Sequence, residues 1–82
     1  MRDLDRLDSA VRGALGLPEG TSLSGVGYGK TEDWDSVAHM QLVVAIEDTF
    51  SVTLDDEDVI AMSTYLEIRR ILRDRYAIAV DE

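Results

Sequence analysis

Ser36 and His39 are the residues of this 82-residue chain whose types and spacing most directly suggest chemistry. They stand three positions apart, so a helix beginning at Ser36 would place both within one turn. A hydroxyl beside an imidazole can act as a nucleophile with its base. A hydrolase would also need an oxyanion hole, a group that orients the imidazole and a shaped pocket, which three or four short helices hardly provide. Ser36 is therefore interpreted as an attachment point, with helix capping as the simpler alternative.

Residues 36–50 are predicted to form the helix that positions both side chains. At about 100° per residue, four apolar side chains fall within one arc of about 100°, the usual width of a core-facing stripe. These side chains are Leu42, Val43, Ile46 and Phe50. His39 lies inside the same arc, which predicts a buried or half-buried histidine with a structural role.

A second apolar group on this helix lies about 120° or more from the centre of the first. It consists of Val37, Met40 and Val44, named here the docking strip. One helix of a small bundle cannot easily bury both faces, so we expect the docking strip to stay partly exposed beside Ser36 as a surface for partners. Glu47 and Asp48 flank it. The alternative is that the strip packs beneath the loop of residues 25–30.

A helix and a long loop are predicted to precede this segment. Residues 2–15 carry an apolar stripe at helical spacing, which Gly16 and Pro18 bring to an end. The stripe consists of Leu4, Leu7, Val11, Ala14 and Leu15. Residues 16–35 hold all but one of the glycines and show no sustained period, so they are predicted to form a long loop.

Two further helices are predicted after residue 50. The acids of Asp55-Asp56-Glu57-Asp58 suit a helix N-terminus and are expected to be solvated there. A short helix follows, with apolar positions at Val59, Ile60 and Met62. Thr64-Tyr65-Leu66-Glu67 matches a capping box and opens the last helix, before a short extended tail over residues 77–80. The apolar positions of this last helix are Leu66, Ile68, Ile71, Leu72 and Tyr76.

Charge is distributed unevenly along the chain. The net charge is −9, and residues 31–67 contain ten acidic residues and no lysine or arginine. This pattern argues against binding to nucleic-acid backbones and favours partners with basic surfaces. A merely solvating acidic face is the alternative.

Several other classes of site are disfavoured. The chain has no cysteine, which excludes disulfides and thiolate metal sites. The segment from Gly25 to Thr31 is one residue too short between its glycines for a P-loop, and the acidic clusters lack the spacing of a calcium loop, so no metal site is predicted. No window approaches 18 apolar residues and no secretion signal is evident, so a cytoplasmic protein that does not enter membranes is expected.

The motif around Ser36 resembles that of the acyl carrier protein family. The matching residues are Asp35-Ser36-Val37, then Leu42-Val43-Val44-Ala45-Ile46-Glu47, Phe50 and Thr64. The resemblance implies a single domain over residues 1–82, folded as a four-helix bundle with a long first loop and a short third helix. It also implies that Ser36 carries 4'-phosphopantetheine from coenzyme A, and that Asp35 assists recognition by the phosphopantetheinyl transferase.

The function implied by this resemblance is that of a monomeric carrier and not of an enzyme. The attached phosphopantetheine, called the arm below, would hold an acyl, aminoacyl or glyceryl group as a thioester for biosynthetic enzymes with basic docking surfaces. The expected partner contacts are Val37, Met40, Val44, Glu47, Asp48 and Asp56. Asp33 and Trp34 depart from the usual family pattern, and Ala38 and Gln41 occupy positions that are often acidic in carriers of fatty-acid synthesis. The Trp34-Asp35-Ser36 pattern resembles that of discrete carriers from specialised pathways, which favours such a carrier over one of fatty-acid synthesis. A peptidyl-carrier-type protein of nonribosomal peptide synthesis and an unmodified helical interaction module are the alternatives.

Overall fold

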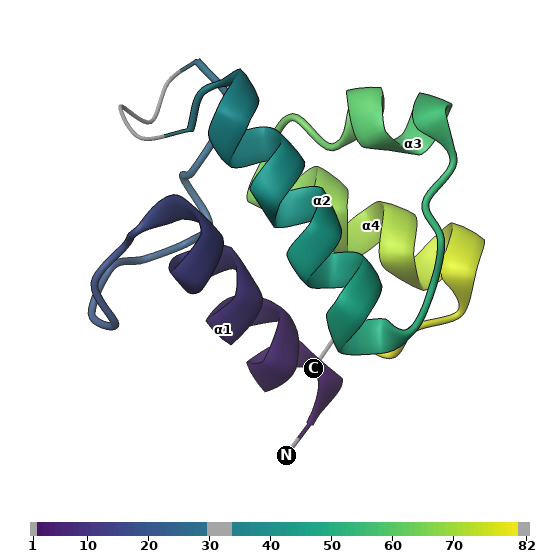
Figure 1. Ribbon diagram of the computed structural model, residues 1–82. Helices are drawn as coiled ribbons and strands as arrows, with labels where there is room; N and C mark the ends of the chain where they lie inside the picture. The colour runs from purple at the N-terminus through teal and green to yellow at the C-terminus, as the bar shows by residue number, and fades with distance from the viewer. Residues whose placement is uncertain (1, 30–33, 81–82) are drawn as a thin grey trace.

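Four helices make up the regular structure of residues 2–29 and 34–80, the part of the chain that the computed structural model describes (Figure 1). In order they are α1 (Asp3–Leu15), α2 (Ser36–Phe50), α3 (Asp56–Ala61) and α4 (Tyr65–Tyr76). Among these residues the only β-type pairing is an isolated antiparallel bridge between Gly27 and Thr64. The predicted all-α class is therefore confirmed. None of the described helices has the length and apolar character needed to cross a lipid bilayer.

α1 packs against α2 through the apolar stripe that its sequence predicts. Leu4, Leu7, Val11 and Leu15 are buried on one face of the helix. The helix ends at Gly16, whose left-handed backbone (φ 67°) lets its N–H donate to the carbonyl of Arg12. Because a residue with a side chain is strained in this conformation, glycine at this position gives α1 a defined end.

The long loop between α1 and α2 contributes to the core. Leu23, Val26 and Trp34 are buried, although no helix occurs in the described residues of this segment. The loop is also fixed by two backbone hydrogen bonds near the start of α4. The N–H of Tyr65 donates to the carbonyl of Val26 (3.1 Å), and the N–H of Tyr28 donates to the carbonyl of Ser63 (2.8 Å).

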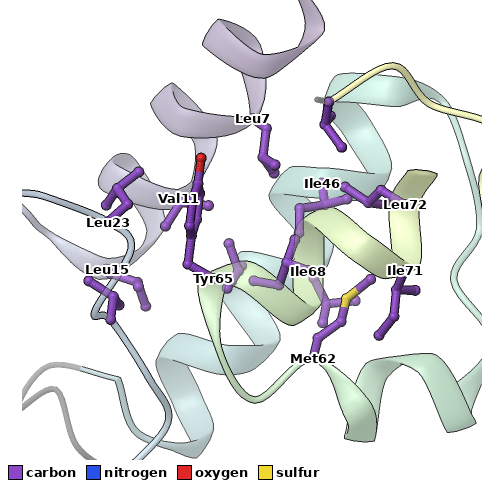
Figure 2. Close-up of a cluster of buried hydrophobic side chains, with 14 of the residues drawn as sticks. Leu7, Val11, Leu15, Leu23, Ile46, Met62, Tyr65, Ile68, Ile71 and Leu72 are labelled. Atoms are coloured by element: carbon purple, nitrogen blue, oxygen red, sulfur yellow. The ribbon is translucent and has the colours of Figure 1, made fainter. Parts of the chain in front are cut away.

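α4 supplies much of the core between α1 and α2, where its side chains meet Leu7, Val11 and Ile46 (Figure 2). Its buried residues are Tyr65, Ile68, Ile71 and Leu72. Thr64 caps the helix by accepting a hydrogen bond from the N–H of Glu67 (3.0 Å), as the capping box predicts. Leu66 was predicted to be an apolar position of this helix, but it lies off the buried stripe and is 53% exposed.

α3 docks in a way that the sequence analysis did not predict. Its one buried residue is Asp58, whereas Ile60, predicted as an apolar position, is 79% exposed. Met62 follows the helix and is the residue that enters the core. The expectation that residues 55–58 are uniformly solvated is therefore wrong for Asp58, because its carboxylate accepts hydrogen bonds from the hydroxyl of Tyr76 (2.6 Å) and from Nε of Arg75 (2.7 Å).

The segment after α4 returns to the core. Ala77 has a left-handed backbone (φ 55°), and the N–H of Ile78 then donates to the carbonyl of Leu72 (3.0 Å). Ile78 and Val80 are buried. Residues 77–80 are thus a packed extension of the core, which is more than the short extended tail predicted from the sequence.

Candidate functional site

Asp35, and not Ser36, caps the N-terminus of α2. The Asp35 carboxylate accepts a hydrogen bond from the N–H of Ala38 (2.9 Å), and its backbone carbonyl accepts from the N–H of His39 (2.8 Å). Ser36 is the first residue of the helix, and its side chain is exposed. The alternative that Ser36 serves as the helix cap is therefore wrong. Its hydroxyl lies at the surface without the capping role that serine often has at such a boundary.

Ser36 lies on the wall of an open cavity of about 400 Å³. The cavity is bounded by residues from the first loop, α2, α3 and the turn before α4. They are Tyr28, Ser36, His39, Met40, Val59, Ile60 and Ser63. In Figure 1, α3 faces the N-terminal part of α2, which is where this cavity lies. A group attached to Ser36 would therefore have an apolar recess next to it.

His39 forms the polar connection between the loop, α2 and α3. Its Nδ1 accepts a hydrogen bond from the indole Nε1–H of Trp34 (3.0 Å), and its Nε2 is 2.8 Å from the carbonyl oxygen of Val59. An indole N–H can only donate, so Nδ1 must be unprotonated, and the ring proton sits on Nε2 and is donated to Val59. The predicted structural histidine is confirmed. Neither ring nitrogen is left to accept a proton from Ser36.

The rings of Trp34 and Tyr28 enclose this imidazole. Trp34 lies beside it, with centroids 5.9 Å apart and planes 21° apart, while Tyr28 meets it edge-on at 5.7 Å. Trp34 is only 1% exposed. Its departure from the family pattern thus has a structural explanation, since the large ring fills the core behind His39 and supplies the donor that fixes the imidazole.

The docking strip is exposed, as predicted. Val37 is 66% exposed, Met40 56% and Val44 53%. The alternative, in which these side chains are packed beneath the loop, is therefore wrong for the described residues. Ile60, predicted only as an apolar position of the short helix, adds a further exposed apolar side chain at the cavity.

The predicted acidic contacts fall into two groups. Asp48 and Asp56 are exposed, so both remain accessible to a partner. Glu47 is half-buried, and its Oε2 accepts a hydrogen bond from the N–H of Leu54 (2.8 Å). Glu47 therefore has an internal role in fixing the connection between α2 and α3. Asp33 lies outside the described residues.

Asp58 links α3 to the C-terminal end of α4. The hydroxyl of Tyr76 donates to its carboxylate and accepts from the N–H of Asp55 (2.9 Å). These contacts lower the pKa of Asp58, chiefly through the hydrogen bond from Tyr76 and then through that from Arg75. In the described part of the chain, no group of three or more histidine, cysteine or acidic residues is placed to hold a metal ion.

Tyr28, Ile60 and Ser63 are cavity residues that the sequence analysis did not identify. They come from separate segments, and the backbone pairing of residues 26–28 with residues 63–65 brings Tyr28 and Ser63 together. No local pattern in the sequence marks them.

Comparison of the chain with models of protein families, with curated protein sequences and with solved structures gave no significant match. The resemblance to acyl carriers therefore depends on the motif around Ser36 and on the positions that follow it at matching spacing.

Proposed function

We propose that this protein is a carrier that is modified with 4'-phosphopantetheine on Ser36 and presents an acyl group, bound as a thioester, to biosynthetic enzymes. The observation that carries the proposal is the position of Ser36. Its exposed hydroxyl lies at the start of α2 and on the wall of an apolar cavity, next to the exposed docking strip. An attachment point needs this combination of access for a modifying enzyme and space for the attached group.

The N-terminus of α2 also suits the phosphodiester of such an arm. The positive end of the helix dipole and the N–H groups of the first turn favour an anion at this position. Asp35 already satisfies the N–H of Ala38, so the phosphodiester would interact mainly with the dipole and the remaining first-turn groups. The bound arm would supply the thiol that forms the thioester. The transferase supplies the base for the transfer, so the engagement of both His39 nitrogens is compatible with modification.

The arrangement of the helices supports the same proposal. A long loop leads to Ser36, and a short helix, α3, lies beside α2. This order is the one expected for a four-helix bundle of acyl-carrier type. Partner enzymes would contact Val37, Met40 and Val44, with Asp48 and Asp56 attracting a basic surface.

The direct test is the intact mass of the protein after reaction with coenzyme A and a phosphopantetheinyl transferase of broad specificity. We expect a mass increase equal to one arm in the native chain and none in Ser36→Ala. Ser63→Ala is the matched control, because Ser63 is an exposed serine on the same cavity. Loss of modification in both variants, or modification of folded Ser36→Ala, would contradict the assignment of Ser36.

The docking strip has a separate test. Met40→Glu should impair turnover by a partner enzyme much more than it lowers the midpoint of thermal unfolding, because the side chain is 56% exposed. Leu66→Glu is the matched control on α4, where a similarly exposed apolar side chain lies outside the strip. Equal impairment by both substitutions would show that the strip is not the partner surface.

An unmodified helical interaction module is the second candidate, favoured by the exposed apolar side chains on both α2 and α3. Such a module would use the same strip without any arm. It would show no mass increase with any transferase tested, so the same measurement separates the two functions.

A further inference from the structure

We infer that Trp34 and His39 close the inner end of the cavity beside Ser36, so that the carrier accommodates a short acyl group at its surface and does not admit a long alkyl chain into the core. This inference rests on the proposed function. It assigns the class of cargo, and it makes Trp34 and His39 the residues that determine specificity for chain length.

The position of the two rings carries the argument. His39 lines the cavity, whereas Trp34, hydrogen-bonded to His39 and 1% exposed, does not. The imidazole thus separates the recess from the indole behind it. Leu42, one turn further along α2, is also 1% exposed, so the space beyond the two rings belongs to the packed core.

Hydrogen bonds hold this barrier in place. The imidazole is fixed on one side by Trp34 and on the other by the carbonyl of Val59, at 3.0 and 2.8 Å. A chain that passed into the core would have to displace the ring, leaving a buried indole N–H and a helix carbonyl without partners. It would also have to make space in a close-packed region, which strains the side chains around it.

The outer part of the cavity suits a small apolar group. Met40, Val59 and Ile60 provide apolar walls, and the hydroxyl-bearing residues Tyr28 and Ser63 are exposed at the same cavity. A short acyl group could contact the walls while its thioester remained close to solvent. The extra length of a longer chain would stay outside the core.

In the experiment, the transferase loads the full chain with a phosphopantetheine arm that carries a butyryl, octanoyl or dodecanoyl group, from the corresponding acyl-coenzyme A. In the transfer, a bond forms between Ser36 Oγ and phosphorus, and the bond from phosphorus to the nucleotide part of coenzyme A breaks. Adenosine 3',5'-bisphosphate leaves, and the serine proton passes to the base of the transferase. The rate of thioester cleavage by hydroxylamine is then measured for each carrier and for the free acyl-pantetheine of the same length.

We expect the cleavage rates, each divided by that of the free thioester, to agree within about twofold from butyryl to dodecanoyl, because no methylene of the longer chain enters the core. Each methylene that did enter the core would favour the protected form by about fourfold. The midpoint of thermal unfolding should likewise show no progressive rise with chain length. Protection of the dodecanoyl thioester by more than about tenfold over the butyryl one would overturn the inference.

Two variants sharpen the result. His39→Ala removes the barrier and should introduce protection that increases with chain length, while Ile60→Ala, on the outer wall, should not. If His39→Ala does not fold, the series on the native chain still decides the inference. A chain that gains no mass at Ser36 overturns the proposed function and this inference together, whereas a loaded chain with strong length dependence overturns the inference alone.

Discussion

α1 and α3 are both held against the α2–α4 core, but by different kinds of contact. α1 buries a stripe of four aliphatic side chains, whereas the one buried residue of α3 is Asp58. α3 is further attached by the hydrogen bond between His39 and the Val59 carbonyl. Apolar burial is nondirectional and independent of protonation, while hydrogen bonds depend on geometry and those to a carboxylate depend also on its protonation.

The contrast between the two helices indicates where the structure can open. A short helix with little apolar burial should separate from the core at a lower free energy than the global unfolding of the chain. α3 forms one wall of the cavity beside Ser36, through Val59 and Ile60. The less strongly docked helix is thus at the candidate site, and the apolar docking of α1 maintains the framework around it.

The largest effect is expected from loss of apolar docking on the α1 side. Leu7 is fully buried, so Leu7→Ala should lower the free energy of unfolding by about 2–5 kcal/mol, a large fraction of the stability of a small domain. Chemical denaturation measures this change. Leu66→Ala, at a half-exposed leucine of α4, is the control and should change stability by no more than about 0.5 kcal/mol. Similar losses in both variants would contradict the apolar docking of α1.

A second prediction compares two tyrosines of α4 that bind carboxylates on different sides of the molecule. Tyr76 donates to Asp58 on α3, and Tyr65 donates to Asp8 on α1. Tyr76→Phe should accelerate hydrogen exchange at the amides of Val59 and Met62, whose N–H groups donate to the carbonyls of residues 55 and 58. Tyr65→Phe should leave exchange at these two amides unchanged. Equal effects would show that α3 does not open separately.

Acid should release α3 in the same selective way. The pKa of Asp58 is lowered by Tyr76 and Arg75, so its contribution to stability is present above the pKa of an unfolded aspartate, about 3.9, and is lost as the pH falls through the lower folded value. Glu67 and Asp74 also have lowered pKa values, through hydrogen bonds from Arg70 and Arg73, but these groups lie on α4.

Below about pH 4, the protection factor of the Met62 amide, which is the slowing of its exchange relative to an unstructured chain at the same pH, should therefore fall before those of amides within α1. Asp58→Asn is the control, because it removes the titrating group and should abolish the pH dependence of the protection factor of this amide. Simultaneous loss of protection in both helices would indicate global acid unfolding and would contradict the selective effect.

The smallest effect is expected at the start of α2. Asp35→Ala removes the capping hydrogen bond to Ala38 and should cost about 1 kcal/mol in the free energy of unfolding. Ser36→Ala leaves this bond intact, so it should cost less than about 0.5 kcal/mol. Denaturant midpoints of the two variants test the assignment, and the reverse order would restore Ser36 as the cap.

Local patterns in the sequence were sufficient for much of the fold. The bounds of α2, the exposure of the docking strip and the cap at Thr64 depend on periodicity and on residues within one turn of each other, so each could be predicted. The sequence does not distinguish Asp58 from its neighbours, because the general preference of acids for helix N-termini is the same for all four acids from residue 55 to 58. Its burial depends on Tyr76, which a different helix supplies.

The candidate site was predictable only in part, because some of its residues come from distant segments of the chain. The motif located Ser36, and the helical arc indicated a structural role for His39. The cavity could not be predicted, because Tyr28 and Ser63 line it together with His39 through the folding of the long loop onto the start of α4. Glu47 was likewise expected at the surface, since its partner is a backbone N–H in the following connection.

Trp34 is the single indole of the chain, and it contacts the imidazole that lines the cavity beside Ser36. Its ultraviolet fluorescence therefore originates from one known place. Acylation or enzyme docking that displaces the imidazole would alter that emission, whereas events remote from it would not. The protein thus contains an intrinsic optical reporter, usable in stopped-flow experiments without any attached dye.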